Sequence, residues 1–275
     1  MSGTVTAAVV QMTSSADVER NLAAAERLID QAARRGAALV ALPENFAYLR
    51  SEGEPVPEAQ DLGDEGASPW VQRLAAQARR LQITLLLGSL PEKVPGEARV
   101  YNTSVLLGPD GRRLARYRKI HLFDIDVPGL EHLKESRAVL PGSEVVVAET
   151  PGGPLGLSIC YDLRFPELYR RLTRQGARVL AVPSAFTDRT GKDHWEVLLR
   201  ARAVENLAYV LAPAQVGSHG RGRASHGHAM IVDPWGAILA QVADGEGVAV
   251  ADLDFDRQDR LRRELPALAH ARLLD

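Results

Sequence analysis

The sequence predicts an α/β fold in which two sheets pack face to face and helices cover both outer faces. Segments with the periodicity of strands and of helices alternate along the whole chain of 275 residues. They give about a dozen strands, more than one open sheet holds comfortably. Two packed sheets with helices on each side would bury the apolar faces of all these elements. Because no segment has the composition of a linker, we predict a single domain over residues 1–275.

The first half of the chain begins with a β-α-β unit. Residues 5–10 and 38–42 are apolar runs with the length of strands, and residues 18–35 carry apolar side chains on one helical face before Gly36 ends the helix. This order of elements predicts parallel pairing of the two strands. The further elements expected before residue 120 are a loop over 51–68, a helix over 69–81, a strand over 83–88, and a hairpin of strands 101–107 and 113–118.

The second half repeats the alternation of strands and helices after an irregular segment over 121–140. It supplies the remaining strands and helices that two sheets covered by helices need. The elements expected there are strands over 145–149, 156–160, 179–183, 209–215, 228–232, 238–242 and 248–253, helices over 165–174, 192–207 and 256–263, and a loop rich in glycine and arginine over 218–225.

Charge and composition exclude several classes of protein. The chain has 33 basic and 35 acidic residues and a net charge of −2, which argues against a nucleic-acid partner and a polybasic membrane anchor. No apolar run reaches the roughly 18–20 residues of a membrane span, and the N-terminus lacks the basic residues of a signal peptide. The single cysteine, Cys160, allows no intrachain disulfide. We therefore expect a cytoplasmic protein without nucleic-acid or membrane partners.

Cys160 is the first candidate for chemistry. It ends the predicted strand 156–160 and precedes a predicted helix, so the positive end of that helix and nearby backbone N–H groups could favour a thiolate. The residues that follow it, among them Asp162 and Arg164, are polar where a core would be apolar. The alternative is that Cys160 is a buried core residue, as many lone cysteines are.

Two residues of opposite charge stand at the ends of other predicted strands. Glu44 follows the strand 38–42, where α/β folds place ligands, and partial burial would raise its pKa and make it a general base. Lys119 is one of four lysines in a chain that otherwise uses arginine, and its compact ammonium suits an oxyanion. The alternatives are a helix cap or surface acid for Glu44 and a solvated strand end for Lys119.

Five segments together resemble the nitrilase (carbon–nitrogen hydrolase) superfamily. Within it the chain looks most like the Nit amidase branch, which contains omega-amidase and deaminated-glutathione amidase. The resemblance extends from about residue 5 to residue 266. The segments are Leu-Pro-Glu-Asn at 42–45, Tyr-Arg-Lys-Ile-His-Leu-Phe-Asp-Ile-Asp-Val-Pro-Gly at 117–129, Gly-Leu-Ser-Ile-Cys-Tyr-Asp-Leu-Arg-Phe-Pro-Glu-Leu at 156–168, His-Trp-Glu-Val-Leu-Leu-Arg-Ala-Arg-Ala at 194–203 and Gly-His-Ala-Met-Ile-Val-Asp-Pro-Trp-Gly at 227–236.

This resemblance implies a four-layer α-β-β-α sandwich with two mixed sheets, which pairs into an eight-layer homodimer. It implies that Cys160 is the nucleophile, Glu44 the general base and Lys119 the oxyanion stabiliser, the last helped by the backbone N–H of Tyr161. A second glutamate of the family falls on Glu135, and the neighbouring Glu131 fits the spacing less well. The resemblance also places Phe186 and Thr190 in the pocket wall.

Arg164 is expected to bind a carboxylate of the substrate. It lies four residues after Cys160, and a guanidinium suits bidentate carboxylate binding better than an ammonium does. Other Nit-like amidases carry arginine at the matching position. The alternative is that Arg164 pairs with Asp162 or Glu167 and only fixes the turn.

Other motifs do not predict a cofactor or a metal. His226 and His228 would share one strand face, but no cysteine and no clear third ligand completes a site with them or with His219. The family commonly has an aromatic residue where His226 stands, so this difference could alter the pocket rim. The glycines at 217, 220 and 222 lack the lysine and the βαβ frame of a phosphate loop.

The sequence therefore predicts a cofactor-free amidohydrolase that forms a cysteine thioester. Its substrate would be a small amide that bears a carboxylate, such as deaminated glutathione or an α-keto acid ω-amide, and its products an acid and ammonia or an amine. One alternative is a nitrilase or an N-carbamoyl amino acid amidohydrolase, because all of these need the same thiolate and acid–base glutamate. Another is a non-catalytic interaction protein on the same scaffold.

Overall fold

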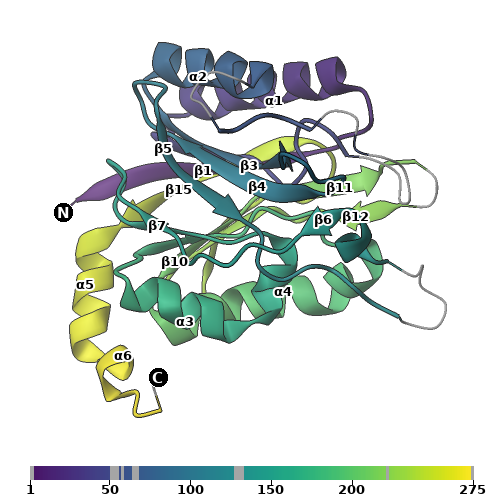
Figure 1. The fold of residues 1–275 in the computed structure, drawn as a ribbon. Coiled ribbons are helices and arrows are strands. Elements are labelled where there is room, and N and C mark those ends of the chain that lie inside the picture. The colour runs from purple at the N-terminus through teal and green to yellow at the C-terminus, as the bar shows by residue number, and fades with distance from the viewer. Residues whose placement is uncertain are drawn as a thin grey trace.

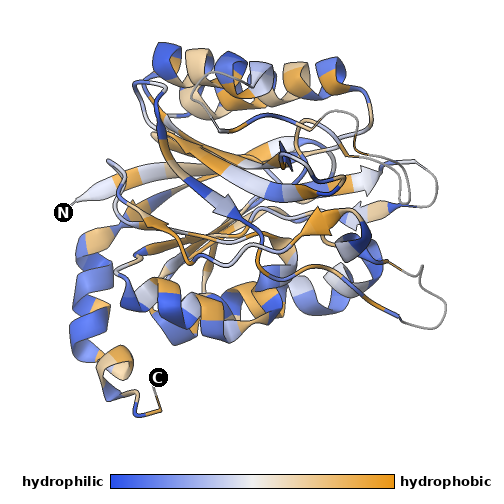
Figure 2. Cartoon of the chain, in the orientation of Figure 1, coloured by the Kyte–Doolittle hydropathy of each residue, from blue (hydrophilic) through white to orange (hydrophobic). Residues whose placement is uncertain are grey.

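The fold is α/β, with two mixed sheets flanked by helices, as the sequence predicts (Figure 1). It is seen in a computed structural model that describes residues 3–49, 56, 59–63, 68–126, 133–220 and 223–273. Helices, sheet, sheet and helices follow one another across the molecule, and hydrophobic residues concentrate between these layers (Figure 2). No helix in the described part of the chain is long and apolar enough to cross a membrane.

The larger sheet has nine strands in the order β12-β11-β1-β2-β3-β4-β5, with β15 also paired to β1 and β6 to β4. Pairing is parallel from β1 through β2 to β3, as the predicted β-α-β unit requires, and antiparallel from β3 through β4 to β5. The strands are β1 (Thr4–Met12), β2 (Leu39–Ala41), β3 (Thr84–Lys93), β4 (Val100–Leu107), β5 (Arg113–Arg118), β6 (Val139–Leu140), β11 (Ala214–Ser218), β12 (Ala224–His226) and β15 (Gly247–Asp254).

The smaller sheet has six strands in the order β14-β13-β10-β9-β8-β7. Its three central strands are parallel, and the strands at both ends are antiparallel to their neighbours. These strands are β7 (Val147–Ala148), β8 (Leu155–Leu157), β9 (Val179–Ala181), β10 (Tyr209–Ala212), β13 (Met230–Val232) and β14 (Ile238–Gln241).

Helices lie on the outer face of each sheet. In Figure 1, α1 and α2 lie over the larger sheet, while α3 and α4 lie over the smaller one. The side chains of Asp17 and Ser68 accept hydrogen bonds from backbone N–H groups in the first turns of α1 and α2, which fixes where these helices begin. The helices are α1 (Val18–Arg34), α2 (Pro69–Leu81), α3 (Pro166–Arg174), α4 (Asp188–Asn206), α5 (Phe255–Glu264) and α6 (Ala267–His270), and the 3-10 turns are η1 (Glu135–Arg137) and η2 (Cys160–Arg164).

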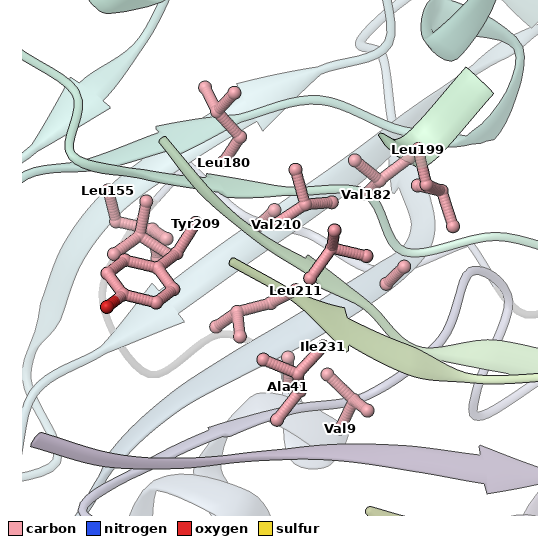
Figure 3. Packing of buried hydrophobic residues seen from close by; sticks show 14 of the residues in the cluster. Val9, Ala41, Leu155, Leu180, Val182, Leu199, Tyr209, Val210, Leu211 and Ile231 are labelled. Atoms are coloured by element: carbon pink, nitrogen blue, oxygen red, sulfur yellow. The ribbon is translucent and has the colours of Figure 1, made fainter. Parts of the chain in front are cut away.

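Buried side chains form two clusters. One contains residues of both sheets and of α3 and α4, and the other lies between the larger sheet and the helices α1 and α2. Figure 3 shows Val9 and Ala41 of the larger sheet facing Leu211 and Ile231 of the smaller one, and all four are fully buried. This packing of the two sheets fixes the loops at the strand ends, where the polar residues gather.

Several predicted elements differ from the structure, among them the strand 83–88, which continues to Lys93 as β3. The predicted strand 209–215 is two strands, because the chain changes sheets at Pro213, which has no N–H to donate to a ladder. The predicted strand 156–160 ends at Leu157, and Cys160 instead begins η2. The predicted helix 192–207 begins four residues earlier, at Asp188.

Some predictions fall on parts of the chain that are only partly described. Most of the predicted loop 51–68 lies outside the described residues, as does Glu131. The predicted loop 218–225 contributes to the ends of β11 and β12, which pair with each other, and its residues 221–222 are not described.

Candidate active site

Glu44 is held where the chain leaves β2. The next residue, Asn45, has a φ of +57° and donates its N–H to Ser89 Oγ at 3.0 Å. A Cβ at Gly88 would collide with the carbonyl oxygens of Leu42 and Pro43, so this close approach of two backbones requires glycine. The glutamate is therefore set on a rigid segment at the end of a central strand.

Lys119 is held in the same way at the end of β5. Its backbone N–H donates to the carbonyl of Asn102 on β4 at 2.9 Å, which extends the hairpin pairing by one residue. Its side chain is 2% exposed. The ammonium is thus directed into the protein, and the alternative of a solvated strand end is wrong.

Four side chains meet in one buried cluster. Lys119 Nζ lies 2.9 Å from Glu44 Oε1, and 3.1 Å and 2.9 Å from the two carboxylate oxygens of Glu135. The side-chain amide of Asn102 donates to Glu44 Oε1 at 2.9 Å and to Glu135 Oε1 at 3.2 Å. Two carboxylates thus share one ammonium and one amide.

Backbone N–H groups complete the binding of both carboxylates. Ala185 donates to Glu44 Oε2 at 2.9 Å, and Phe123 donates to Glu135 Oε2 at 2.7 Å. Five segments of the chain therefore contribute to the cluster, from the ends of β2 and β5, from β4, from η1 and from the loop after β9. Glu44 is not the helix cap or surface acid that the sequence alone allowed.

Cys160 stands beside this cluster in a left-handed backbone conformation. Its φ is +45°, an uncommon value for a residue with a side chain, and its N–H donates to the carbonyl of Pro183 at 2.9 Å. Its buried thiol lies next to Glu44, whose negative charge acts on it. Strained turns of this kind between a strand and a helix expose nucleophiles in other hydrolase folds.

Asp162 holds the Cys160 turn in place. Its fully buried carboxylate accepts the N–H of Ile159 at 2.8 Å and the hydroxyl of Tyr117 at 2.7 Å. It also accepts the backbone N–H of His121 at 3.0 Å and lies 2.7 Å from Nδ1 of the same histidine. Asp162 therefore ties the turn to the segment around Lys119, which brings the thiol to the charged cluster.

Burial and charge set the protonation of the site in a way that the sequence does not predict. Burial alone would raise the pKa of Glu44, but the Lys119 charge and hydrogen bonds from Lys119, Cys160 and Ala185 outweigh it and hold that pKa below its usual value. The expectation of a raised pKa is therefore wrong. The pKa of Lys119 lies well above its usual value, because Glu135 and Glu44 outweigh the effect of burial.

The prediction that Cys160 is favoured as a thiolate is also wrong for the resting site. Burial raises the pKa of its thiol well above the usual value, and the negative charge of Glu44 adds to this effect. The resting arrangement is thus a thiol, a carboxylate and an ammonium. A carboxylate next to a thiol can accept its proton, and the ammonium can stabilise negative charge that develops nearby.

Arg164 does not form the ion pairs that the sequence left open. Asp162 is occupied by the groups that hold the Cys160 turn, and Arg164 Nη1 lies 3.2 Å from Nδ1 of His194. The guanidinium carbon is 5.1 Å from the ring centre of Phe186 and 5.8 Å from that of Tyr161. Arg164 therefore stands on an aromatic surface between η2 and α4.

The two other residues expected in the pocket wall have different surroundings. Phe186 directly follows Ala185, which donates to Glu44, and its ring packs 5.2 Å from that of Trp195. The hydroxyl of Thr190 lies 2.7 Å from that of Thr187 at the start of α4. The structure thus brings Phe186 next to the cluster, while Thr190 binds within its own helix turn.

The histidines singled out in the sequence have local partners. His219 Nδ1 lies 2.8 Å from the carbonyl of Ser14, and its Nε2 lies 2.9 Å from Ser225 Oγ. The rings of His226 and His228 stack with their centres 4.3 Å apart. In the described part of the chain, no three histidine, cysteine, aspartate or glutamate side chains gather as metal ligands would.

Sequence reasoning missed two residues of this site. Asn102 is a polar residue inside the predicted strand 101–107, and this could have marked it as a candidate. Asp162 was considered only as a polar neighbour of Cys160 and as a possible partner of Arg164. Nothing local to either residue indicates that its partners come from segments as far away as Glu44, Tyr117 and His121.

Comparison with known proteins shows close relatives. A family model described as carbon–nitrogen hydrolase matches residues 6–263. The chain is 51% identical over 267 residues to the deaminated glutathione amidase of Synechocystis sp., with 96% of this chain and 97% of that protein covered.

Solved structures agree with this match. The crystal structure of the Caenorhabditis elegans NitFhit protein superposes with a TM-score of 0.89 at 40% identity, over 98% of this chain and 66% of that chain. A variant of the amidase from Nesterenkonia sp. AN1, in which acrylamide has added to the active-site cysteine, superposes with a TM-score of 0.77 at 30% identity, over 95% of this chain and 98% of that chain.

Proposed function

The chain belongs to the carbon–nitrogen hydrolase family and is an amidase with an active-site cysteine, and we propose that Cys160, Glu44, Lys119 and Glu135 carry out its reaction. One observation supports this most strongly: a buried thiol lies next to a buried carboxylate whose charge acts on it, and that carboxylate lies 2.9 Å from a buried ammonium. These are the groups that acyl transfer through a thioester needs.

In the first half of the proposed reaction, Glu44 takes the proton of Cys160 and the sulfur attacks the amide carbon. The C=O double bond becomes a C–O⁻ single bond, and the oxyanion is stabilised by the Lys119 ammonium and the backbone N–H of Tyr161. Loss of one such donor typically costs about 10²–10³ in rate. Protonated Glu44 then gives its proton to the leaving nitrogen, the C–N bond breaks, and a thioester remains.

In the second half, water attacks the thioester carbon and Glu44 takes a proton from it. The C–S bond breaks, the acid leaves, and the proton on Glu44 returns to the sulfur. Glu135 helps to orient the water and fixes Lys119, which it contacts at 2.9 Å and 3.1 Å. Glu44 must be ionised at the start of each half, and its lowered pKa supports this role.

We propose a small amide with a carboxylate as the substrate. The Synechocystis relative is a deaminated glutathione amidase, and this compound or an α-keto acid ω-amide fits a site with a guanidinium at its edge. Arg164 is available for such a carboxylate, because Nη1 of its guanidinium lies 3.2 Å from Nδ1 of His194 and not against an acid. A nitrilase or an N-carbamoyl amino acid amidohydrolase would use the same cluster, and substrate screening separates them.

We also propose that the single domain is cytoplasmic, where its thiol stays reduced, and that it pairs through the outer face of α4 into an eight-layer homodimer. Val197 and Val204 on α4 are 60% and 49% exposed, and Trp235 beside them is 59% exposed. Arg200 Nε donates to the carbonyl of Gly236 at 2.8 Å and joins these two segments. A twofold axis would bury this apolar surface against its own copy.

The central test is Cys160→Ala with a screen of amides and nitriles. The wild-type protein should release ammonia or an amine from deaminated glutathione or α-ketoglutaramate and leave simple nitriles unchanged. The variant should fold and release neither. Equal rates in both proteins would contradict the mechanism, and a wild-type protein inactive on every substrate would favour a non-catalytic role. Light scattering at micromolar concentration tests the dimer, and a monomer mass would contradict it.

A further inference from the structure

Asn102 contacts both carboxylates of the site and belongs to none of the roles described above. We propose that it is a positioning residue: its side-chain amide holds the carboxylates of Glu44 and Glu135 side by side at the single Lys119 ammonium. Its Nδ2 donates to Glu44 Oε1 at 2.9 Å and to Glu135 Oε1 at 3.2 Å. The inference rests on the proposed roles of Cys160 and Glu44.

The two inner oxygens of the cluster have the same two donors. Lys119 Nζ donates to Glu44 Oε1 at 2.9 Å and to Glu135 Oε1 at 3.1 Å, and the Asn102 amide donates to the same pair. Each outer oxygen has a backbone donor of its own, and Glu135 Oε2 also accepts from Lys119 at 2.9 Å. Asn102 is therefore the one neutral side chain in the described structure that bridges the two carboxylates.

The orientation of the amide follows from chemistry. If it were rotated by half a turn, its Oδ1 would face two carboxylate oxygens with no hydrogen between them. In the orientation seen, Oδ1 is buried and has no hydrogen-bond partner in the described structure. A buried carbonyl oxygen without a donor lowers stability. The hydrogen bonds from the amide nitrogen to both carboxylates compensate for this loss of stability.

The charge balance shows what a neutral donor contributes. The cluster holds two carboxylates and one ammonium next to a thiol, so one negative charge is not neutralised by a side chain. A second cation in place of Asn102 would neutralise that charge and make Glu44 a weaker base. A side chain without a donor would favour protonation of one carboxylate. An amide stabilises both ionised groups and does not itself titrate.

Asn102 also has a matched control on the same strand. Its neighbour Thr103 points to the opposite face of β4, where its hydroxyl donates to Glu92 Oε2 at 2.8 Å. Both residues are buried, and each donates to a buried glutamate. The isosteric changes Asn102→Leu and Thr103→Val therefore remove the same kind of bond on the same strand, one at the site and one away from it.

The test follows the pH dependence of Cys160 modification by methyl methanethiosulfonate. Cys160 is the only cysteine in the chain, so the mass of the intact protein reports on it alone. The reaction requires the pair of Cys160 and Glu44 to lose one proton. Other titratable groups face this pair: Lys119 and Glu135 in the cluster, and Asp162 with His121 behind the turn. The wild-type protein sets the reference pH of half-maximal rate.

Asn102→Leu should move this half-maximal pH upward, because ionised Glu44 loses a donor. On the amide that the wild type hydrolyses, kcat should fall about 10- to 100-fold with little change in KM. Asn102→Asp should move the half-maximal pH further in the same direction, since a third carboxylate replaces the neutral donor. Thr103→Val should lower the melting temperature and leave both the modification profile and kcat unchanged.

A modification profile of Asn102→Leu that matches Thr103→Val would overturn the proposal and make Asn102 a structural residue. If the Leu variant does not fold, the isosteric Asn102→Asp carries the test, and an unchanged half-maximal pH in it has the same meaning. The modification needs no substrate. A wild-type protein without amidase activity would therefore contradict the proposed function and leave this test intact.

Discussion

Two buried glutamate clusters lie on opposite faces of the same β-hairpin, and their charges differ in sign. On one face, Glu92 accepts hydrogen bonds from the hydroxyl of Thr103 and from the guanidinium groups of Arg116 and Arg118, with donor–acceptor distances of 2.7–2.9 Å. On the other face, Glu44 and Glu135 share the ammonium of Lys119. Strand alternation separates the clusters, because Thr103 and Asn102 are consecutive, as are Arg118 and Lys119.

This difference explains how one hairpin supports both stability and chemistry. Glu92 has two cations for its one carboxylate. The carboxylate therefore has a low affinity for a proton, and its hydrogen bonds are all formed. The other cluster has one cation for two carboxylates, and one of these also contacts a thiol. A surplus of positive charge fixes Glu92 as an anion, whereas a shortage lets Glu44 accept and return a proton.

The largest expected effect comes from the same substitution in both clusters. Glu44→Gln should lower kcat/KM by about 10²–10⁴, because the proposed general base is lost. Glu92→Gln should leave kcat/KM nearly unchanged and lower the free energy of unfolding by about 1–3 kcal/mol, since charged hydrogen bonds become neutral ones. Steady-state kinetics and urea unfolding of both variants provide the measurements. A similar kinetic loss in both would remove the distinction between the clusters.

A second pair of substitutions removes the cations. Lys119→Met should lower kcat by about 10²–10³ through loss of the oxyanion donor. It should also cost about 3–5 kcal/mol of stability, because the buried carboxylate of Glu44 and the partly buried carboxylate of Glu135 lose their shared partner. Arg118→Met leaves Arg116 on Glu92, so its stability loss should be smaller and its kcat unchanged. Thermal unfolding measures the loss of stability, and single-turnover kinetics measure the loss of rate. A Lys119→Met variant that remains active would contradict the role proposed for Lys119.

Local signals in the sequence predicted most of the elements. The bounds of α2 match the prediction because Ser68 caps the helix and Pro69 begins it. The change of sheet at Pro213 was missed because β10 is buried along its whole length, as is the start of β11. An apolar run that is buried on both sides carries no alternation that could show where one sheet ends.

Motifs in the sequence carry the candidate residues, whereas some of their partners are set only by the fold. Cys160, Glu44, Lys119 and Glu135 stand in recognisable segments, and the structure brings them together. Asn102 acts on Glu44 across 58 positions of sequence, so its partners become visible only in the fold. The pKa directions of Glu44 and Cys160 were predicted wrongly because both are set in the fold. Burial, with the charge of Glu44, raises the pKa of Cys160, and the charge and hydrogen bonds of distant residues outweigh burial at Glu44.

A third prediction concerns Arg164, which lies outside both clusters. Arg164→Met should lower kcat/KM on a carboxylate-bearing amide by about 10²-fold, the effect of about 2–3 kcal/mol from a charged hydrogen bond. A neutral amide of similar size should be affected much less. Competing hydrolysis of the two substrates by one enzyme sample measures this ratio. Equal losses on both would show that Arg164 supports the Cys160 turn and does not select the substrate.

The smallest expected effect is the dependence of stability on pH, and it tests whether Glu92 is fixed as an anion. Burial would raise its pKa, but the hydrogen bonds from Arg118 and Thr103 and the charges of Arg116 and Arg118 outweigh it and hold the pKa below the usual value. A glutamate with a lower pKa in the folded state binds fewer protons than in the unfolded state, so its contribution is complete above the unfolded pKa of about 4.3. This contribution is lost as the pH falls through the folded pKa.

Wild-type protein should therefore be more stable than Glu92→Gln at pH 7, and the difference in free energy of unfolding should shrink below about pH 4. Urea unfolding across this range measures the difference, and a gap that stays constant with pH would show that the charge of Glu92 does not contribute to stability.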